Sequence, residues 1–240
     1  MNTFDALNPA TGEVIAIHQI YEKADVDEVV EKAKVATRQW QALGYGGRKS
    51  ILQKWRRNRI SHIDEIAALM VAESGKSLSE AKLETFISIS HLNWASKNAR
   101  RYLTLQKRKT SKLLFNFTAE VDRKPFGVVG VIGPWNYPVF TPMGSISYAL
   151  AAGNAVVFKP SEYTTGVGKL LEKTFNEITP IPNVFTCITG LAETGTHLTN
   201  SDIGKLSFTG STKTAKLVAK NAAEKIMPLV LETSGKDAVI

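Results

Sequence analysis

The chain has 240 residues, 43% of them hydrophobic and 22% charged, a composition typical of a globular protein that buries a large core. Its net charge of +8 could attract a polyanion, but the basic runs at 53–59 and 99–109 are typical of solvated helix faces, and no nucleic-acid-binding motif accompanies them. Without a signal-like N-terminus or a window near the roughly 18 consecutive apolar residues of a membrane span, we expect a soluble, cytoplasmic protein that binds neither nucleic acid nor a membrane.

Three amphipathic helices are predicted in the first part of the chain. From Asp25 onward, apolar residues recur at the spacing of one helix face, with Asp25 as the N-cap and Glu28 three residues later, as in a capping box. A second helix is predicted over about 48–74, where Gly75 can follow it in the left-handed conformation. A third is predicted over 77–101.

The pattern of apolar and polar residues changes in the second half of the sequence. Residues 113–123 alternate apolar and polar side chains, which is typical of a half-exposed strand. After Lys124 come short apolar runs without alternation, which fit strands buried on both faces of a parallel sheet. These runs lie at 126–132, 154–159, 184–189, 205–210 and 228–232. Helical patterns separate them at 142–152, 164–178, 193–200 and 212–225.

The alternation of strand and helix requires crossover connections between parallel strands. We therefore predict an α/β fold with a doubly wound, Rossmann-like parallel sheet that is preceded by an N-terminal helical segment. The chain divides into a helical portion (1–110), a strand (111–124) and the Rossmann-like core (125–240). No internal repeat or flexible linker interrupts this order.

A doubly wound sheet binds ligands beyond the carboxyl ends of its strands, so the residues that follow each apolar run are candidates for a site. The turn at 208–211 ends one run and opens a helix, whose free N–H groups could stabilise a phosphate. An ordinary capped helix start is the alternative. The segment from Gly190 to Gly195 resembles a phosphate loop less closely, because lone glycine spacings are weak evidence.

Two charged residues, Lys159 and Glu162, directly follow another apolar run. The ammonium could donate to one hydroxyl of a ribose while the carboxylate accepts from the other. A turn that carries two solvated charges would have the same sequence, and that alternative stays open.

Three further side chains are considered as candidate catalytic groups. Asn136 lies in a loop bounded by prolines, and its amide could donate to an oxygen that becomes negative; a turn asparagine is the alternative. Glu232 ends an apolar run and could be a partly desolvated carboxylate able to act as a general base; a surface glutamate is the alternative. The single cysteine, Cys187, lies within an apolar run, which favours an inert buried thiol.

Six motifs together resemble those of the aldehyde dehydrogenase superfamily in their order and approximate spacing. They are NPATGEV, FGVVGVIGPWNYP, ALAAGNAVVFKPSE, the TG-rich turn after residue 188, FTGST and LETSGK. Six motifs in order are far more specific than any one of them. The resemblance covers nearly the whole chain and implies the NAD(P)-binding half of an enzyme that, at full length, oxidises an aldehyde to a carboxylic acid.

The resemblance also implies roles for individual residues. Asn136 matches the family's oxyanion-stabilising asparagine, and Glu232 matches the general base that activates the hydrolytic water. Lys159 and Glu162 match the pair that holds the adenosine ribose. The carboxylate of Glu162 would repel the 2′-phosphate of NADP+, so NAD+ is the favoured cofactor and NADP+ is left open. No metal is expected. The residues expected to bind the cofactor are Ile132, Pro134, Trp135, Lys159, Ser161, Glu162, Gly190, Gly195, Phe208, Thr209, Gly210 and Ser211.

In the family mechanism a cysteine thiolate adds to the aldehyde and a hydride passes to NAD(P)+. That nucleophile is expected in a separate catalytic domain, downstream of Glu232 and absent from these 240 residues, so cofactor binding without turnover is predicted. The strand within 111–124 resembles part of the arm by which these enzymes form dimers or tetramers, which predicts a homo-oligomer. The alternative is a non-catalytic nucleotide-binding or oligomerisation module.

Overall fold

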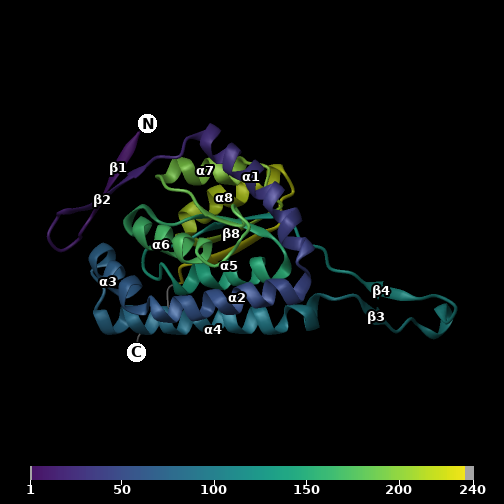
Figure 1. Ribbon diagram of the computed structural model, residues 1–240. Coiled ribbons are helices and arrows are strands. Elements are labelled where there is room, and N and C mark those ends of the chain that lie inside the picture. Colours follow the sequence, from purple (N-terminus) through teal and green to yellow (C-terminus); the bar gives the residue numbers. More distant parts are fainter. Residues whose placement is uncertain (1, 236–240) are drawn as a thin grey trace, which may run out of the picture.

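The computed structural model describes residues 2–235 (Figure 1). At its centre is a parallel sheet with the strand order β7-β6-β5-β8-β9. Its strands are β5 (Val128–Ile132), β6 (Ala155–Lys159), β7 (Phe185–Cys187), β8 (Lys205–Gly210) and β9 (Leu229–Thr233). The chain moves outward from β5 to β7 and then returns to the other side of β5 to add β8 and β9. The carboxyl ends of β5 and β8 therefore form the switch point at which doubly wound sheets bind ligands.

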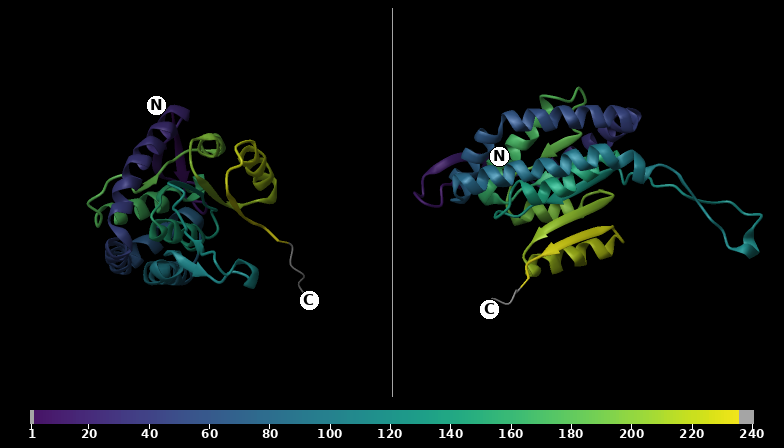
Figure 2. Two further views of the ribbon diagram at one scale, coloured as in Figure 1. Left: turned by 90° about the vertical axis from the view of Figure 1, so that its right-hand side faces the viewer. Right: turned by 90° about the horizontal axis from the view of Figure 1, so that it is seen from below.

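Helices cover both faces of this sheet (Figures 1 and 2). On one face lie α5 (Phe140–Ala152) and α6 (Thr165–Asn176), with α2 (Gly44–Ser61), α3 (Ile63–Ser74) and α4 (Leu78–Leu103) outside them. On the other face lie α1 (Lys23–Ala42), α7 (Ala192–Asn200) and α8 (Thr212–Glu224). The predicted order of strands and helices after Lys124, and the doubly wound α/β fold, are confirmed.

The apolar runs do not alternate because both faces of the central strands are buried. All five residues of β6 are buried, and their side chains point alternately into two cores. Val156 and Phe158 pack into the core beneath α5 and α6. Ala155 and Val157 pack into the core beneath α1 and α7. Strands that are buried in this way favour continuous apolar sequence.

The first helix begins at Lys23, three residues earlier than an N-cap at Asp25 would place it. Glu22 is its N-cap, and the Asp25 side chain accepts a hydrogen bond from the Glu22 N–H at 2.9 Å. A capping box is present, but Glu22 and Asp25 form it, and the prediction of Asp25 with Glu28 was wrong. The register was missed because Asp25 suits either end of the motif.

The helix predicted over 48–74 is in fact two helices, which meet at His62. The Nδ1 atom of His62 lies 2.8 Å from the Asn58 carbonyl oxygen, so the ring engages a carbonyl of the last turn of α2. The apolar spacing runs on across this break, which is why periodicity alone did not reveal it. Gly75 ends α3 in the left-handed conformation, with φ +69°, as predicted.

Two hairpins correct the predicted layout of the N-terminal portion. Residues 1–110 are not wholly helical, because β1 (Thr3–Leu7) and β2 (Val14–Gln19) form an antiparallel pair. The continuous strand predicted over 113–123 is also wrong. A short helical turn, η1 (Lys112–Leu114), precedes β4 (Ala119–Val121), which pairs with β3 (Gln106–Arg108).

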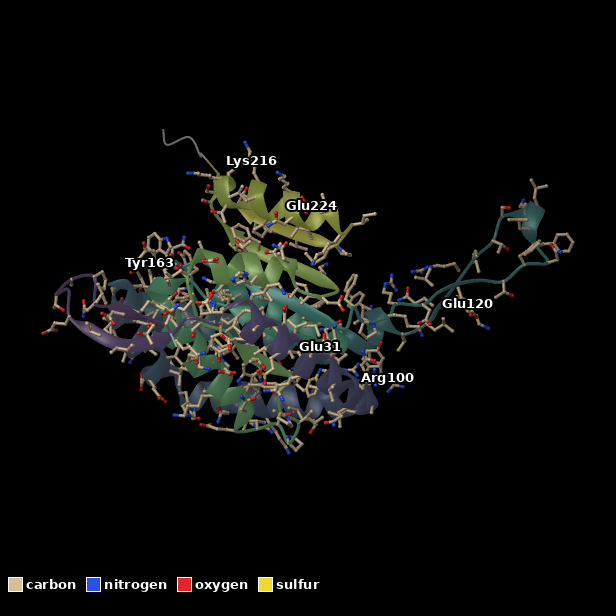
Figure 3. The ribbon with its side chains drawn as sticks, turned by 90° about the horizontal axis from the view of Figure 1, so that it is seen from above. Glu31, Arg100, Glu120, Tyr163, Lys216 and Glu224 are labelled. Atoms are coloured by element: carbon tan, nitrogen blue, oxygen red, sulfur yellow. The ribbon has the colours of Figure 1, made fainter. Side chains whose placement is uncertain are left out.

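The β3–β4 hairpin forms an arm that extends away from the body, as Figure 3 shows around Glu120. Leu113 is 91% exposed and Phe115 is 86% exposed near its tip. Alternation of apolar and polar residues predicts a strand only where a sheet buries one face, and the described residues bury neither face of the arm tip. A role for the arm in oligomerisation stays a prediction.

The basic run at 53–59 is not wholly a solvated face. Arg59 is fully buried, donates to Ser88 Oγ at 2.9 Å and lies 5.8 Å from the Trp55 ring centroid. Burial lowers the pKa of Arg59 to about 10. Among residues 2–235, no helix has the length and apolar character needed to span a membrane.

Candidate active site

A cavity of about 700 Å³ opens at the carboxyl ends of the sheet, at the switch point between β5 and β8. Its walls come from the turns that follow β5, β6, β8 and β9, and from α7 and α8. All the predicted site residues except Gly190 line it. Those brought together are Ile132, Pro134, Trp135, Asn136, Lys159, Ser161, Glu162, Gly195, Phe208, Thr209, Gly210, Ser211 and Glu232.

Gly190 shapes the turn behind the cavity. Its φ is +147°, and a Cβ there would lie 2.1 Å from Thr194 Oγ1. Thr194 in turn donates to the Tyr21 carbonyl oxygen at 2.9 Å. Glycine is therefore required here for the close approach of α7, and not as a wall of the cavity.

The Lys159–Glu162 pair places a buried cation beside a partly exposed carboxylate. Lys159 ends β6 and is only 4% exposed. Its Nζ donates to the Pro160 carbonyl oxygen at 3.1 Å and lies 3.9 Å from a Glu162 carboxylate oxygen. Burial lowers the pKa of Lys159, and the negative charge of Glu162 opposes that shift. An ammonium group has three donors, so it can still donate to a hydroxyl in the cavity while Glu162 accepts.

The turn after β8 directs the N-terminus of α8 into the cavity. Ser211 is the N-cap, and its Oγ accepts from the Thr214 N–H at 3.2 Å. The capped helix start that was the alternative is therefore present, and it does not exclude a phosphate site. The first N–H groups of a helix have no partner within it, and together with the helix dipole they stabilise an anion.

The turn after β5 carries Asn136 to the cavity. The Oδ1 atom of Asn136 accepts from the Tyr137 N–H at 3.0 Å. This bond directs the Nδ2 group the other way, where no described residue accepts from it, so it can donate to a ligand oxygen. Trp135 also lines the cavity and is 56% exposed.

Glu232 lines the cavity from β9, where it is in register with Thr209 of β8. The predicted partial desolvation is wrong for residues 2–235, since Glu232 is exposed. The reason is its position, because β9 is an edge strand of the sheet and no described element covers this end of it. Lys236, the last residue of the LETSGK motif, lies outside the described residues.

The single cysteine lies away from the cavity. Cys187 is fully buried in β7, at the opposite edge of the sheet from β9. Its backbone N–H donates to Glu172 at 3.0 Å. Burial raises the pKa of the Cys187 thiol far above its ordinary value. The predicted burial of this thiol is confirmed, and its inertness stays a prediction. Within 2–235 no group of three His, Cys, Asp or Glu side chains could hold a metal ion.

Sequence reasoning missed two kinds of residue at this site. Leu217 and Val218 of α8 add apolar surface to the cavity wall. The amphipathic pattern of this helix does not show which of its residues line a cavity. Lys76 and Glu84 hold the Asn136 turn from the far side. They precede the turn by more than 50 residues along the chain, so no local signal connects them with it.

The sheet and the switch-point cavity define a Rossmann-like α/β domain, a fold class in which ligands bind at this position. Over residues 1–240 the sequence matches the Aldehyde dehydrogenase family. The chain belongs to this family of oxidoreductases, in agreement with the resemblance of its six motifs.

Individual relatives support this assignment. One relative is the "Probable succinate-semialdehyde dehydrogenase (NADP(+))" of Sinorhizobium fredii. It is 35% identical, and the match covers 97% of this chain and 47% of the relative. Lactaldehyde dehydrogenase from Escherichia coli is 29% identical, with a TM-score of 0.92 over 98% of this chain and 49% of that one. Two structures of PnpE, one in complex with nicotinamide adenine dinucleotide and one from Pseudomonas sp. WBC-3, are each 30% identical, with a TM-score of 0.92 over 99% of this chain and 48% of the other chain. The chain spans about half the length of the curated relatives it matches.

Proposed function

We propose that this chain binds NAD+ in the switch-point cavity and contributes Asn136 and Glu232 to the oxidation of an aldehyde to a carboxylic acid. One observation carries the proposal. The buried Lys159 with the partly exposed Glu162, the N-terminus of α8 and the Asn136 amide all converge on one cavity. Membership of the aldehyde dehydrogenase family supports the same reaction.

The residues of the cavity fit a dinucleotide. Lys159 and Glu162 offer a donor and an acceptor to the two hydroxyls of a ribose. The first turn of α8 would stabilise the negative charge of a diphosphate, and Ile132 and Phe208 add apolar wall. When bound, the nicotinamide supplies the acceptor for the hydride of the aldehyde.

In the reaction, an aldehyde and a water become a carboxylate while a hydride leaves to the cofactor and protons are released. The Asn136 Nδ2 group would donate to the carbonyl oxygen as that oxygen gains negative charge under attack by a thiolate. Glu232 would accept a proton from the water that hydrolyses the resulting thioester. Cys187 cannot provide that thiolate, because it is buried and outside the cavity. Residues 1–240 alone should therefore bind NAD+ without oxidising aldehydes.

Titration with NAD+ should quench tryptophan fluorescence, because Trp135 lines the cavity. The other three tryptophans, Trp40, Trp55 and Trp94, do not line it. The variant Trp135→Phe should lose most of the quench yet still gain thermal stability from NAD+, since a ligand that binds only the folded state raises its stability. Millimolar NAD+ that produces neither quenching nor a higher Tm would overturn cofactor binding. Formation of NADH from an aldehyde by residues 1–240 alone would refute the inert role of Cys187.

The choice between NAD+ and NADP+ should depend on Glu162. Removing its charge in Glu162→Gln removes repulsion of a 2′-phosphate, worth about 1 kcal/mol at a partly exposed site. The ratio of the Kd values for NADP+ and NAD+ should therefore fall about fivefold. An unchanged ratio would take Glu162 out of the ribose site and would leave cofactor binding itself unaffected.

A further inference from the structure

An ion pair between the buried Glu84 and the partly buried Lys76 contacts the turn that carries Asn136. Glu84 lies on α4, and its side chain is 1% exposed. Lys76 lies just before α4, and its ammonium pairs with the Glu84 carboxylate. Helix α4 packs against α5, and the hydrogen bonds of Glu84 to Val139 and Phe140 place this pair at the start of α5.

The Glu84 carboxylate caps α5 from outside the helix. Its Oε1 atom accepts from the backbone N–H groups of Val139 and Phe140, at 2.9 and 3.0 Å. Val139 is the N-cap residue of α5 and has no side-chain oxygen to cap the helix. A residue on a separate helix therefore satisfies the first donors of α5.

Lys76 holds the other end of the same segment. Its Nζ donates to the Asn136 carbonyl oxygen at 2.7 Å and lies 4.3 Å from the Tyr137 ring centroid. The pair thus contacts the backbone at both ends of 136–140. Among the described residues, the Gly133 N–H donates to the Lys159 carbonyl oxygen at 3.1 Å before Asn136, and the Val139 carbonyl oxygen accepts from the Met143 N–H at 3.1 Å within α5.

We propose that Lys76 and Glu84 are positioning residues for Asn136. The Asn136 side chain is oriented by its bond to the Tyr137 N–H, so the direction of its Nδ2 group follows the backbone at 136 and 137. That backbone is held by the ion pair. A donor to a developing oxyanion must be in place before the reaction. The Lys76–Glu84 ion pair fixes the position of the Asn136 donor, because the turn has few backbone hydrogen bonds of its own. The inference rests on the proposed role of Asn136.

The variant Lys76→Met removes the clamp on Asn136 and leaves the Glu84 cap on α5. Amide hydrogen exchange at 136–140 should become about tenfold faster, equivalent to about 1.4 kcal/mol. The Kd for NAD+ from fluorescence should change less than about threefold, because Lys159, Glu162 and α8 are untouched. In an aldehyde-oxidising form of the enzyme, kcat should fall about tenfold while KM for NAD+ stays within about twofold, as expected when an interaction of the transition state is lost. Lys76→Arg keeps the charge, so its amide exchange at 136–140 and its kcat should stay close to the wild-type values.

A matched control lies on the neighbouring helix. Glu73 of α3 is also buried, and it caps α6 in the same way, accepting from the Gly166 and Val167 N–H groups at 2.7 and 3.0 Å. Glu73→Gln should speed exchange at the start of α6 and leave 136–140 unchanged. Equal acceleration at 136–140 in both variants would mean general loosening and would overturn the proposal. So would wild-type exchange and wild-type kcat in Lys76→Met.

Failure of this inference and failure of the proposed function are distinguishable. Absence of NAD+ binding by the wild-type chain contradicts the proposed function, whatever the exchange rates are. Wild-type NAD+ binding together with an unaltered turn in Lys76→Met contradicts only the positioning role.

Discussion

Substitution of Lys159 by methionine should weaken NAD+ binding by roughly 10- to 100-fold, because a hydrogen bond from a charged donor contributes about 1.5–3 kcal/mol. Lys159 is 4% exposed, so water competes little for its ammonium. The substitution should not destabilise the fold. Burial lowers the pKa of Lys159, which means that the folded chain disfavours the charged form, and methionine fills a similar volume without a charge. The free energy of unfolding should therefore stay the same or rise while affinity falls.

The Kd from quenching of Trp135 fluorescence measures this effect. Lys216→Met is the matched control, since Lys216 is exposed on α8 and outside the cavity wall (Figure 3), and its loss removes the same unit of charge. A similar loss of affinity in both variants would assign the effect to net charge. Unchanged affinity in Lys159→Met would remove Lys159 from the cofactor site.

Trp55→Ala should have the largest effect on stability, a loss of about 3–5 kcal/mol, as is usual when a buried aromatic side chain is truncated. The Trp55 ring is fully buried and lies 4.9 Å from the ring centroid of Phe175 and 5.8 Å from that of Phe185. Its Nε1 donates to Thr174 Oγ1 at 3.0 Å. Truncation would leave a cavity between α2, α6 and β7 and would deprive a buried hydroxyl of its donor.

Denaturant unfolding followed by circular dichroism measures this loss without relying on tryptophan emission. Trp94→Ala is the control, because Trp94 is 49% exposed on α4, where it stacks on Tyr102 and meets the Tyr148 ring edge to face. We expect a change within about 1 kcal/mol there. A loss below about 1 kcal/mol for Trp55→Ala, or equal losses in both variants, would contradict the assignment of Trp55 to the core.

Much of the architecture could be predicted from sequence because its signals are local. The continuous apolar runs marked strands buried on two faces, and the helical patterns between them required a doubly wound sheet. Parallel strands present their carboxyl ends at one edge. Residues that follow different runs, such as Asn136, Lys159 and Ser211, could therefore be assigned to one site before any contact was known, and they do line one cavity.

The tertiary structure decided whatever depends on contacts between distant segments. The capping box moved to Glu22, and a single predicted helix divided at His62. The predicted strand at 113–123 lies on a projecting arm, and Glu232 is exposed on an edge strand. Periodicity is the same whether a side chain faces solvent or a neighbour, so it could not settle these points.

The sequence by itself determined the strand order along the chain, the edge of the sheet that carries the site and most of the residues there, because each depends on neighbours within a few positions. Only the tertiary structure placed Lys76 and Glu84 against the Asn136 turn, and Arg59 inside the core. These side chains join segments that are distant along the chain, Lys76 and Glu84 to the backbone of 136–140 and Arg59 to Ser88, so local sequence signals could not reveal the contacts.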